Sequence, residues 1–306
     1  MPQADRSGET GVAGDRHSPY GVLVWSDFAT LRFRLEFVKW WLANLPQFFA
    51  QVRNWPVVVA RILLSSVNVR PGPIVSKLRD GTKIVVPPSR AAWWPTFEMF
   101  CADAYRLKHL RGITVAPGEV VLDIGAHVGT AALLLARQFP DATLVVYEPN
   151  PEAFRYLVEN LDANGVRSIA NAAGVARSDG RTILWGGQSA SCEASTTAEV
   201  PGTSVEVDVV GFDHVVAAAP GPVRVVKIDC EGAEHDILAT SSPTAWADVE
   251  LVLLEYHVLP GTLLGWDSLE ASFRGLGFRT IWHEPFPWQP TLGMAAFRRV
   301  TLVAQS

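Results

Sequence analysis

The feature that most constrains this chain is a buried-strand pattern that runs into a glycine-containing turn, VVLDIGAHVGT, at residues 120–130. The apolar run stops at Asp123, the turn contains Gly125 and Gly129, and a helical pattern (TAALLLARQF) follows at once. A parallel strand covered on both faces is a continuous apolar run, and glycine lets the backbone approach a ligand closely. The free N–H groups at the helix start favour an anionic group. The segment therefore predicts an α/β fold with a ligand site at this turn.

A second apolar strand pattern, VVYEP, ends in an acid at Glu148. An acid at the end of the strand after a glycine-rich turn is placed to accept hydrogen bonds from two ribose hydroxyls. The turn and the acid together predict a pocket for a cofactor that contains adenosine.

The details of the turn indicate which cofactor this is. A dinucleotide site needs G-x-G-x-x-G, and Ala126 stands where the middle glycine would be. Asp123 would repel a pyrophosphate but could hold an ammonium group. S-adenosylmethionine has an amine, a carboxylate, a ribose and a sulfonium, and no phosphate. We therefore predict S-adenosylmethionine, with Asp123 at the amine, the helix start at the carboxylate and Glu148 at the ribose.

A third segment, VRVVKIDCEGAEHDIL at residues 223–238, is another buried strand that leads into a helix. With VLDIGAHVGT, VVYEPNPEAF and LVLLEYH, in chain order around it, the sequence resembles the FkbM family of S-adenosylmethionine-dependent methyltransferases. The resemblance extends from about Pro71 to the C-terminus, and KIDCEGAE is its most specific part. Two positions depart from the family pattern: Cys230 replaces an aliphatic residue, and His127 stands where Asn is frequent.

The resemblance implies a class I methyltransferase fold. This is a Rossmann-like, doubly wound sheet of seven strands with a reversed C-terminal hairpin, preceded here by a helical and hairpin extension. Periodicity alone predicts only alternating strands and helices. Strands are expected at residues 120–124, 143–147, 168–173, 223–228 and 251–256, and in FRTIWHEP and MAAFRRVTLV. Helices are expected at 130–138, 151–164, 233–239 and 263–276, with an antiparallel addition between 181 and 210.

Composition sets the domain organisation. A chain of 306 residues with 48% hydrophobic and 19% charged residues is typical of one large core plus an extension. We expect a disordered tail at 1–20, the helical and hairpin extension at 21–116 and the methyltransferase domain at 117–306. The three cysteines lack metal-ligand spacing, which predicts free thiols in the reducing cytoplasm. A net charge of −5 without a dense basic cluster argues against nucleic acid as a partner.

Residues 21–70 form a Trp-rich segment with helical spacing, six Lys or Arg residues and two acids. We expect breaks at Pro46 and Pro56, and no apolar run is long enough to span a bilayer. Three interpretations remain open: helices packed on the catalytic domain, a homodimer surface, or a helix in weak contact with a membrane surface. Packing is favoured, because amphipathic helices usually bury their apolar stripe in protein.

The next segment, IVSKLRDGTKIVVPP, predicts a hairpin around residues 79–81, followed by a helix that begins at Pro95. The family resemblance places this hairpin and helix over the cofactor pocket. Glu98 and Tyr105 could then face the site, although a surface Glu and a packed Tyr are the favoured interpretations.

Ligands of open α/β sheets bind beyond the carboxyl ends of the strands, which selects the acids and the histidine at these ends. Methyl transfer to an oxygen needs alignment and a base for the acceptor's proton. His257 is the best base by residue type, and Asp229 or Glu255 could orient or replace it. The carboxylates could also bind Mg²⁺, although no ligand spacing demands a metal.

The candidate residues fall into three groups. The cofactor group comprises Asp123, Gly125, Ala126, His127, Gly129, Thr130, Glu148, Pro149, Asn150 and Ala173. The catalytic group comprises His257, Asp229 and Glu255. The group that would support these or touch the substrate comprises Lys227, Glu231, Glu234 and Tyr105. Acids in a helix's first turn also stabilise the helix dipole, which is the alternative role for Glu231 and Glu234.

These observations predict an O-methyltransferase that acts on a hydroxyl of a small molecule such as a sugar, a polyketide or another secondary metabolite. The aromatic, Pro-rich segment at 284–294 could shape the acceptor pocket or be a plain inter-strand loop. The alternatives are a nicotinamide-dependent oxidoreductase, and a non-catalytic protein that binds S-adenosylmethionine or a partner through the Trp-rich segment.

Overall fold

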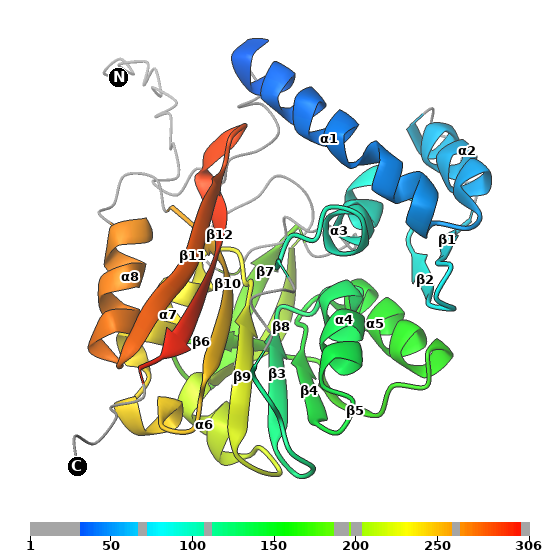
Figure 1. The fold of residues 1–306 in the computed structure, drawn as a ribbon. Coiled ribbons are helices and arrows are strands. Elements are labelled where there is room, and N and C mark those ends of the chain that lie inside the picture. Colours follow the sequence, from blue (N-terminus) through cyan, green and yellow to red (C-terminus); the bar gives the residue numbers. More distant parts are fainter. Residues whose placement is uncertain are drawn as a thin grey trace, which may run out of the picture.

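The computed structural model describes residues 31–66, 72–106, 112–186, 196, 204–258 and 264–300. Its central feature is a seven-stranded sheet in the order β11-β12-β10-β9-β3-β4-β5 (Figure 1). The strands are β3 (Val120–Ile124), β4 (Thr143–Tyr147), β5 (Ser168–Asn171), β9 (Val223–Ile228), β10 (Leu251–His257), β11 (Phe278–Phe286) and β12 (Gln289–Arg299). Six of the seven strands run in the same direction, and β12 runs antiparallel to both of its neighbours. This order confirms the class I methyltransferase fold and its reversed hairpin.

Helices cover both faces of this sheet (Figure 1). On one side lie α3 (Arg90–Phe100), α4 (Thr130–Gln138) and α5 (Pro151–Ala163), and on the other lie α6 (Phe212–Ala217), α7 (Ala233–Thr240) and α8 (Trp266–Gly275). The short 3-10 helix η3 (Pro243–Trp246) packs in the core of this second face. Each face has its own apolar core.

Successive side chains of a strand point to opposite faces of the sheet, so alternate residues pack in different cores. Val121, Val225 and Leu253 pack in the core shared with α3 and α4. Their neighbours along each strand pack in the core shared with α6, α7 and α8. Two residues after Val121, Val225 and Leu253, the strands carry Asp123, Lys227 and Glu255, which by this alternation point to the same face as α3. The charged side chains of three central strands therefore share one face of the sheet.

Most expected element bounds are confirmed within one or two residues, but several are wrong. β10 continues to His257, which is therefore inside the strand rather than beyond it. The expected antiparallel addition is confirmed as the pair of β7 (Gly180–Trp185) and β8 (Ser204–Gly211), which form a separate sheet with β6 (Gly174–Ala176), while α6 after it was not expected. α3 begins at Arg90, not at Pro95, because the Ser89 hydroxyl accepts a hydrogen bond from the Ala92 amide and caps the helix.

The N-terminal extension consists of α1 (Leu31–Gln51), α2 (Trp55–Ser66) and a hairpin of β1 (Ile74–Lys77) and β2 (Lys83–Val86). α1 continues through Pro46, so the expected break there is wrong, whereas Pro56 lies in the first turn of α2, where its missing N–H is not needed. The expected disordered tail at 1–20 and the first ten residues of the expected extension, 21–30, lie outside the described residues.

Aromatic rings join the extension to the rest of the chain. The ring of Trp40 in α1 lies 5.6 Å from that of Trp94 in α3 and 4.9 Å from that of Trp288 at the tip of the β11–β12 hairpin. Figure 1 shows α3 between α1 and the upper ends of the central strands. The favoured interpretation, helices packed on the catalytic domain, is confirmed. Within the described residues, no helix combines the length and apolarity needed to cross a membrane.

Candidate active site

The turn after β3 is held by backbone contacts to the neighbouring strands. Gly125 has a φ of +73°, and an added Cβ would lie 1.7 Å from the carbonyl oxygen of Asp229. The amides of Gly125 and Ala126 both donate to the carbonyl of Tyr147. Glycine is therefore required at 125 because the ends of β3 and β9 approach each other there, and the predicted cofactor turn touches the predicted catalytic strand end.

Glu148 ties the same turn to the end of β4. Its carboxylate accepts hydrogen bonds from the amides of His127 and Asn150, each at 2.7 Å. The side chain is 6% exposed, and burial raises the pKa of Glu148 to about 7, against the lowering effect of these two hydrogen bonds. The carboxylate is thus fixed between the two loops that would surround a ribose.

The other predicted cofactor residues have local structural roles as well. Gly129 and Thr130 begin α4. The Asn150 side chain accepts from the amides of Glu152 and Ala153 and so caps α5. Pro149 lies between Glu148 and this cap, and Ala173 lies beyond the end of β5, packed against the second core. The structure brings the residues of positions 125–130 and 148–150 together, with Ala173 one strand further out.

Asp123 and Lys227 form a buried ion pair at the centre of the sheet. They are register partners on β3 and β9, their charged atoms lie 3.1 Å apart, and their side chains are 0% and 1% exposed. Lys227 also donates to the Gly125 carbonyl at 2.6 Å and lies 3.4 Å from Asp229. Burial opposes a charged lysine, but Asp123 and Asp229 together raise the pKa of Lys227 above its usual value.

This geometry bears on the expected role of Asp123. The Asp123 carboxylate has no exposed surface in this structure, and the charged group beside it is the Lys227 amine, so its contact with a cofactor amine stays a prediction. The sequence contains an indication of this ion pair, because Asp123 and Lys227 are each the next-to-last residue of a buried strand. The sequence places Lys227 among the residues that support the site or touch the substrate, and in the structure its contacts are Asp123, Asp229 and the Gly125 carbonyl.

His257 is held between two carboxylates. Its Nδ1 lies 3.0 Å from Glu234 and its Nε2 lies 3.2 Å from Glu231. Burial would lower the pKa of His257, but Glu231 and Glu234 raise it well above its usual value. Each ring nitrogen of His257 thus already faces a carboxylate in this structure, and the general-base role of His257 stays a prediction.

Glu234 is a positioning group rather than a surface acid. It is 0% exposed and accepts from the His257 amide at 2.7 Å and the Gly232 amide at 2.8 Å. Burial alone would raise the pKa of Glu234, but the contacts with His257 bring it below its usual value. The helix-dipole role that we weighed for Glu234 thus leaves out its main contact, which is the catalytic-group histidine.

Two groups from the α3 region join the acids of β9 and β10. Burial and then the charges of Asp229 and Glu231 raise the pKa of Glu98 to about 8, despite a hydrogen bond from Trp94. Tyr105 is 3% exposed, and burial and then the charges of Asp229 and Glu255 raise its pKa. The favoured surface role for Glu98 is wrong, while the packed Tyr105 is confirmed. The missed signal for Glu98 was its spacing of four residues from Trp94, which puts both on one helix face.

The acids therefore form one cluster, which we call the rim cluster: Glu98, Asp229, Glu231, Glu255 and His257, with Tyr105 beside them. Burial and then the charges of Asp229 and Glu98 raise the pKa of Glu255 well above its usual value. The ligand atoms of Asp229, Glu255 and His257 lie within 4.8 Å of one another. The structure thus brings together the three predicted catalytic residues.

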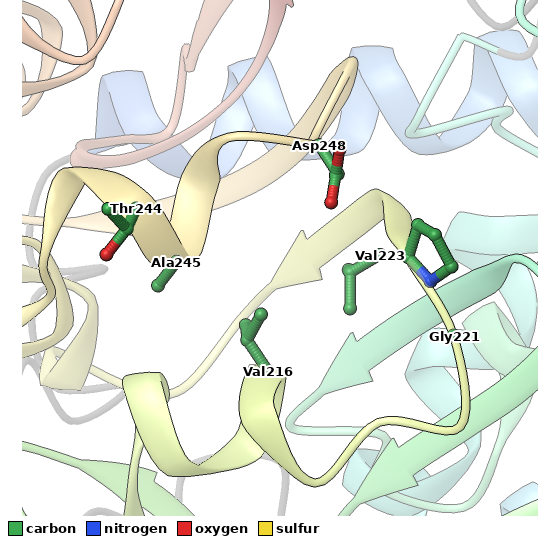
Figure 2. Close-up of a pocket in the computed structure, with 7 residues that line it drawn as sticks. Val216, Gly221, Val223, Thr244, Ala245 and Asp248 are labelled. Atoms are coloured by element: carbon green, nitrogen blue, oxygen red, sulfur yellow. The ribbon is translucent and has the colours of Figure 1, made fainter.

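A separate hollow lies at the opposite end of the sheet (Figure 2). It is lined mainly by apolar and small residues near the start of β9, with one carboxylate: Val216, Gly221, Pro222, Val223, Thr244, Ala245 and Asp248. It contains none of the predicted site residues. Because ligands of such sheets bind at the carboxyl ends of the strands, the candidate active site is the rim cluster and the cofactor turn.

The fold and this site define an S-adenosylmethionine-dependent methyltransferase. The model of the methyltransferase FkbM domain matches residues 123–280, and the chain belongs to this family. A relative in Streptomyces tacrolimicus, 31-O-demethyl-FK506 methyltransferase FkbM, is 28% identical over 215 residues, which are 60% of this chain and 80% of the relative. The resemblance that the sequence motifs indicated is thereby confirmed, and the nicotinamide-dependent alternative is wrong.

Solved structures with a similar fold include M. jannaschii TYW2 in complex with AdoMet, with 15% identity and a TM-score of 0.39, over 74% of this chain and 87% of that one. Another is the putative methyltransferase yhhF from Escherichia coli, with 12% identity and a TM-score of 0.41, over 72% of this chain and 94% of that one.

Proposed function

We propose that the enzyme transfers the methyl group of S-adenosylmethionine to a hydroxyl of a small molecule such as a sugar, a polyketide or another secondary metabolite. The observation that carries the proposal is the contact between the cofactor turn and the rim cluster, where Gly125 abuts the Asp229 carbonyl. A sulfonium held at this turn has carboxylates beside it that can orient a hydroxyl and take its proton. The relative named 31-O-demethyl-FK506 methyltransferase supports an oxygen acceptor.

The proposed cofactor contacts follow the loops. Glu148 binds the ribose hydroxyls, and the backbone at positions 125–130 faces the methionine part, with the amides at the start of α4 near its carboxylate. Asp123 acts through Lys227, which fixes the Gly125 carbonyl. That carbonyl, rather than the buried Asp123 carboxylate, is our revised acceptor for the cofactor's amine.

The proposed step is a displacement in line with the sulfonium. A new C–O bond forms as the C–S bond breaks, the hydroxyl proton passes to a rim carboxylate, and S-adenosylhomocysteine leaves. Glu255 is the proposed base because it lies beside Asp229 at the rim, whereas both ring nitrogens of His257 are held by Glu231 and Glu234. His257 orients the acids, and Glu231 and Glu234 fix its ring.

The remaining partner proposals are smaller. We propose a small-molecule acceptor and no nucleic acid, since the net charge is −5. A cytoplasmic location agrees with the free thiols of Cys101 and Cys230, while Cys192 lies outside the described residues. A homodimer and a weak membrane-surface contact remain proposals for the outer face of α1 and α2.

Calorimetry with S-adenosylhomocysteine and with NADH tests the cofactor, and transfer from methyl-labelled S-adenosylmethionine to a panel of alcohols, amines and thiols tests the acceptor. We expect S-adenosylhomocysteine alone to bind and hydroxyl acceptors alone to be labelled. His257→Ala should reduce turnover by about 100-fold or more and leave S-adenosylhomocysteine affinity nearly intact. Tight cofactor binding with labelled amines, or with no labelled acceptor, would contradict the proposed hydroxyl chemistry.

A further inference from the structure

The rim cluster concentrates negative charge that its own cations do not balance. Lys227 is committed to Asp123, Asp229 and the Gly125 carbonyl, and His257 is committed to Glu231 and Glu234. Among the residues that the structure describes, no Lys or Arg forms an ion pair with Glu255 or Glu98. Both side chains are half-buried, and carboxylates that are withdrawn from water ordinarily pair with a cation or coordinate a metal, so this pair of acids points to a missing positive group.

A tyrosine beside these acids gives a second, independent indication. The hydroxyl of Tyr105 is buried and has no hydrogen-bond partner within the described part of the chain. A buried phenol usually finds a partner, and the carboxylates of Asp229 and Glu255 are close enough to act on this one. The hydroxyl therefore faces a space that a further polar ligand completes.

The orientation of His257 agrees with a metal in that space. Glu234 holds Nδ1 at 3.0 Å and also accepts from the His257 amide, so the ring is fixed from behind. Metal-bound histidines almost always have this second contact, from the other ring nitrogen to a carboxylate or carbonyl. Nε2 is then the nitrogen available for a metal, which would replace the proton now shared with Glu231.

We propose that Asp229, Glu255 and His257 bind one oxygen-preferring divalent cation of the Mg²⁺ or Mn²⁺ class. Ligands about 2.1 Å from an octahedral Mg²⁺ lie about 3 Å apart when they are neighbours and about 4.2 Å apart when they are opposite, so donor atoms that lie within 4.8 Å of one another need to close by up to about 1.8 Å. Two carboxylates and one imidazole suit Mn²⁺ as well as Mg²⁺.

The catalytic use of this cation rests on the proposed function, whereas its binding does not. Bound at the rim cluster, the cation would hold an acceptor's oxygens and lower the pKa of the hydroxyl that is methylated. Such a site favours acceptors with two neighbouring oxygens, as in a vicinal diol or a hydroxy ketone, because both can coordinate one metal.

The experiment titrates Mn²⁺ into the chelator-treated full chain and follows the electron paramagnetic resonance signal of free Mn²⁺. We expect one saturable site that Mg²⁺ displaces. Asp229→Asn and Glu255→Gln should each weaken Mn²⁺ binding at least tenfold. Asp248→Asn, an acid in the hollow of Figure 2 at the other end of the sheet, should leave it unchanged. His257→Gln provides a third ligand variant, and thermal melting identifies any variant that fails to fold.

Calorimetry with S-adenosylhomocysteine in the presence of chelator separates the two proposals. Cofactor binding without a saturable Mn²⁺ site overturns the metal proposal and leaves the proposed function. A Mn²⁺ site that persists in every folded ligand variant also overturns it. Mn²⁺ binding that the ligand variants abolish, in a chain that does not bind S-adenosylhomocysteine, supports the metal site and contradicts the proposed function.

Discussion

The rim cluster and the outer face of α1 and α2 depart from the usual distribution of residues in opposite directions. At the carboxyl ends of the central strands, Asp123, Lys227 and Glu234 are buried almost completely. On α1 and α2, large apolar side chains are exposed, among them Leu42 at 53% and Leu63 at 63%. Charged residues are almost never fully buried unless they are paired, and contiguous exposed apolar patches mark contact surfaces.

The two departures have different physical consequences. The fully buried charges next to the rim cluster, Asp123, Lys227 and Glu234, each have a charged partner, so removing one group leaves another uncompensated in a medium of low polarity. The exposed side chains of α1 and α2 make few contacts within the chain, so removing one costs little. We therefore expect substitutions at the rim to change folding and cofactor binding strongly, and substitutions on the outer face to leave both nearly unchanged.

The largest effect is expected at Gly125. Gly125→Ala adds a Cβ that would lie 1.7 Å from the Asp229 carbonyl oxygen, at a φ of +73°. Gly165 is the matched control, because its φ is +66° and an added Cβ meets nothing within 4 Å. Gly165→Ala should cost about 1–2 kcal/mol from the backbone conformation alone. Gly125→Ala should cost at least about 3 kcal/mol, since the overlap adds to that strain, and should abolish S-adenosylhomocysteine binding.

Urea unfolding and calorimetry measure both effects. Equal destabilisation of the two variants would mean that the ends of β3 and β9 do not approach closely. The proposed contact between the cofactor turn and the rim cluster would then be wrong.

The buried pair of Asp123 and Lys227 should give the next largest effect. Lys227→Met leaves the carboxylate of Asp123 without its cation, which should reduce the free energy of unfolding by about 3–5 kcal/mol. Asp123→Asn in the Lys227→Met background removes the unpaired charge and should restore part of this loss. A double-mutant cycle in urea checks the coupling. Additive effects of the two substitutions would show that the pair contributes no interaction of its own.

Much of this contrast could be predicted from the sequence. The strand and helix motifs locate Asp123, Glu148, Asp229 and Glu255 at one edge of the sheet, because apolar runs of strand length end at these acids. The bounds of β3, β4 and β9 follow from the same runs.

The protonation state of His257 could not be predicted in this way. It depends on two acids, Glu231 and Glu234, that precede it by more than twenty positions and reach it only through the packing of α7 against β10. Residue type suggested a free base, whereas the two carboxylates that hold the ring raise the pKa of His257. The course of α1 through Pro46 is a second example, since tertiary packing of Trp40 and Phe48 overrides the helix-breaking tendency of one proline.

Glu148 should give an intermediate effect that depends on pH. Glu148→Ala should weaken S-adenosylhomocysteine binding by about 1.5–3 kcal/mol through lost charge-assisted hydrogen bonds. In the unsubstituted protein the pKa of Glu148 is raised to about 7 by burial. If the ionised carboxylate binds the ribose, affinity should rise about tenfold between pH 6 and pH 8, because a proton must leave below the pKa and none need leave above it.

The free energy of unfolding should change in the opposite direction. Because the unfolded chain loses this proton near pH 4.5 and the folded chain near pH 7, the contribution of Glu148 to stability falls as the pH rises through that interval. Glu148→Gln should remove most of the pH dependence from both the cofactor affinity and the free energy of unfolding. A cofactor affinity that is independent of pH and survives Glu148→Ala would leave the acid with only its contacts to the His127 and Asn150 amides.

The smallest effects are expected on the outer face of α1 and α2. Leu42→Ser and Leu63→Ser should each change the free energy of unfolding by less than about 0.5 kcal/mol, because both side chains are mostly exposed. Val58 in α2 is the matched control, since it is 0% exposed and packs in the first core. Val58→Ser should cost about 2 kcal/mol or more, because it removes buried apolar surface and buries a hydroxyl.

Sedimentation and vesicle flotation of the two leucine variants then test what the outer face of α1 and α2 contacts. Reduced self-association would favour a homodimer, and reduced flotation would favour a membrane surface. A loss above about 1 kcal/mol in either leucine variant would mean that these side chains are covered within the chain, and the contrast with the rim cluster would fail.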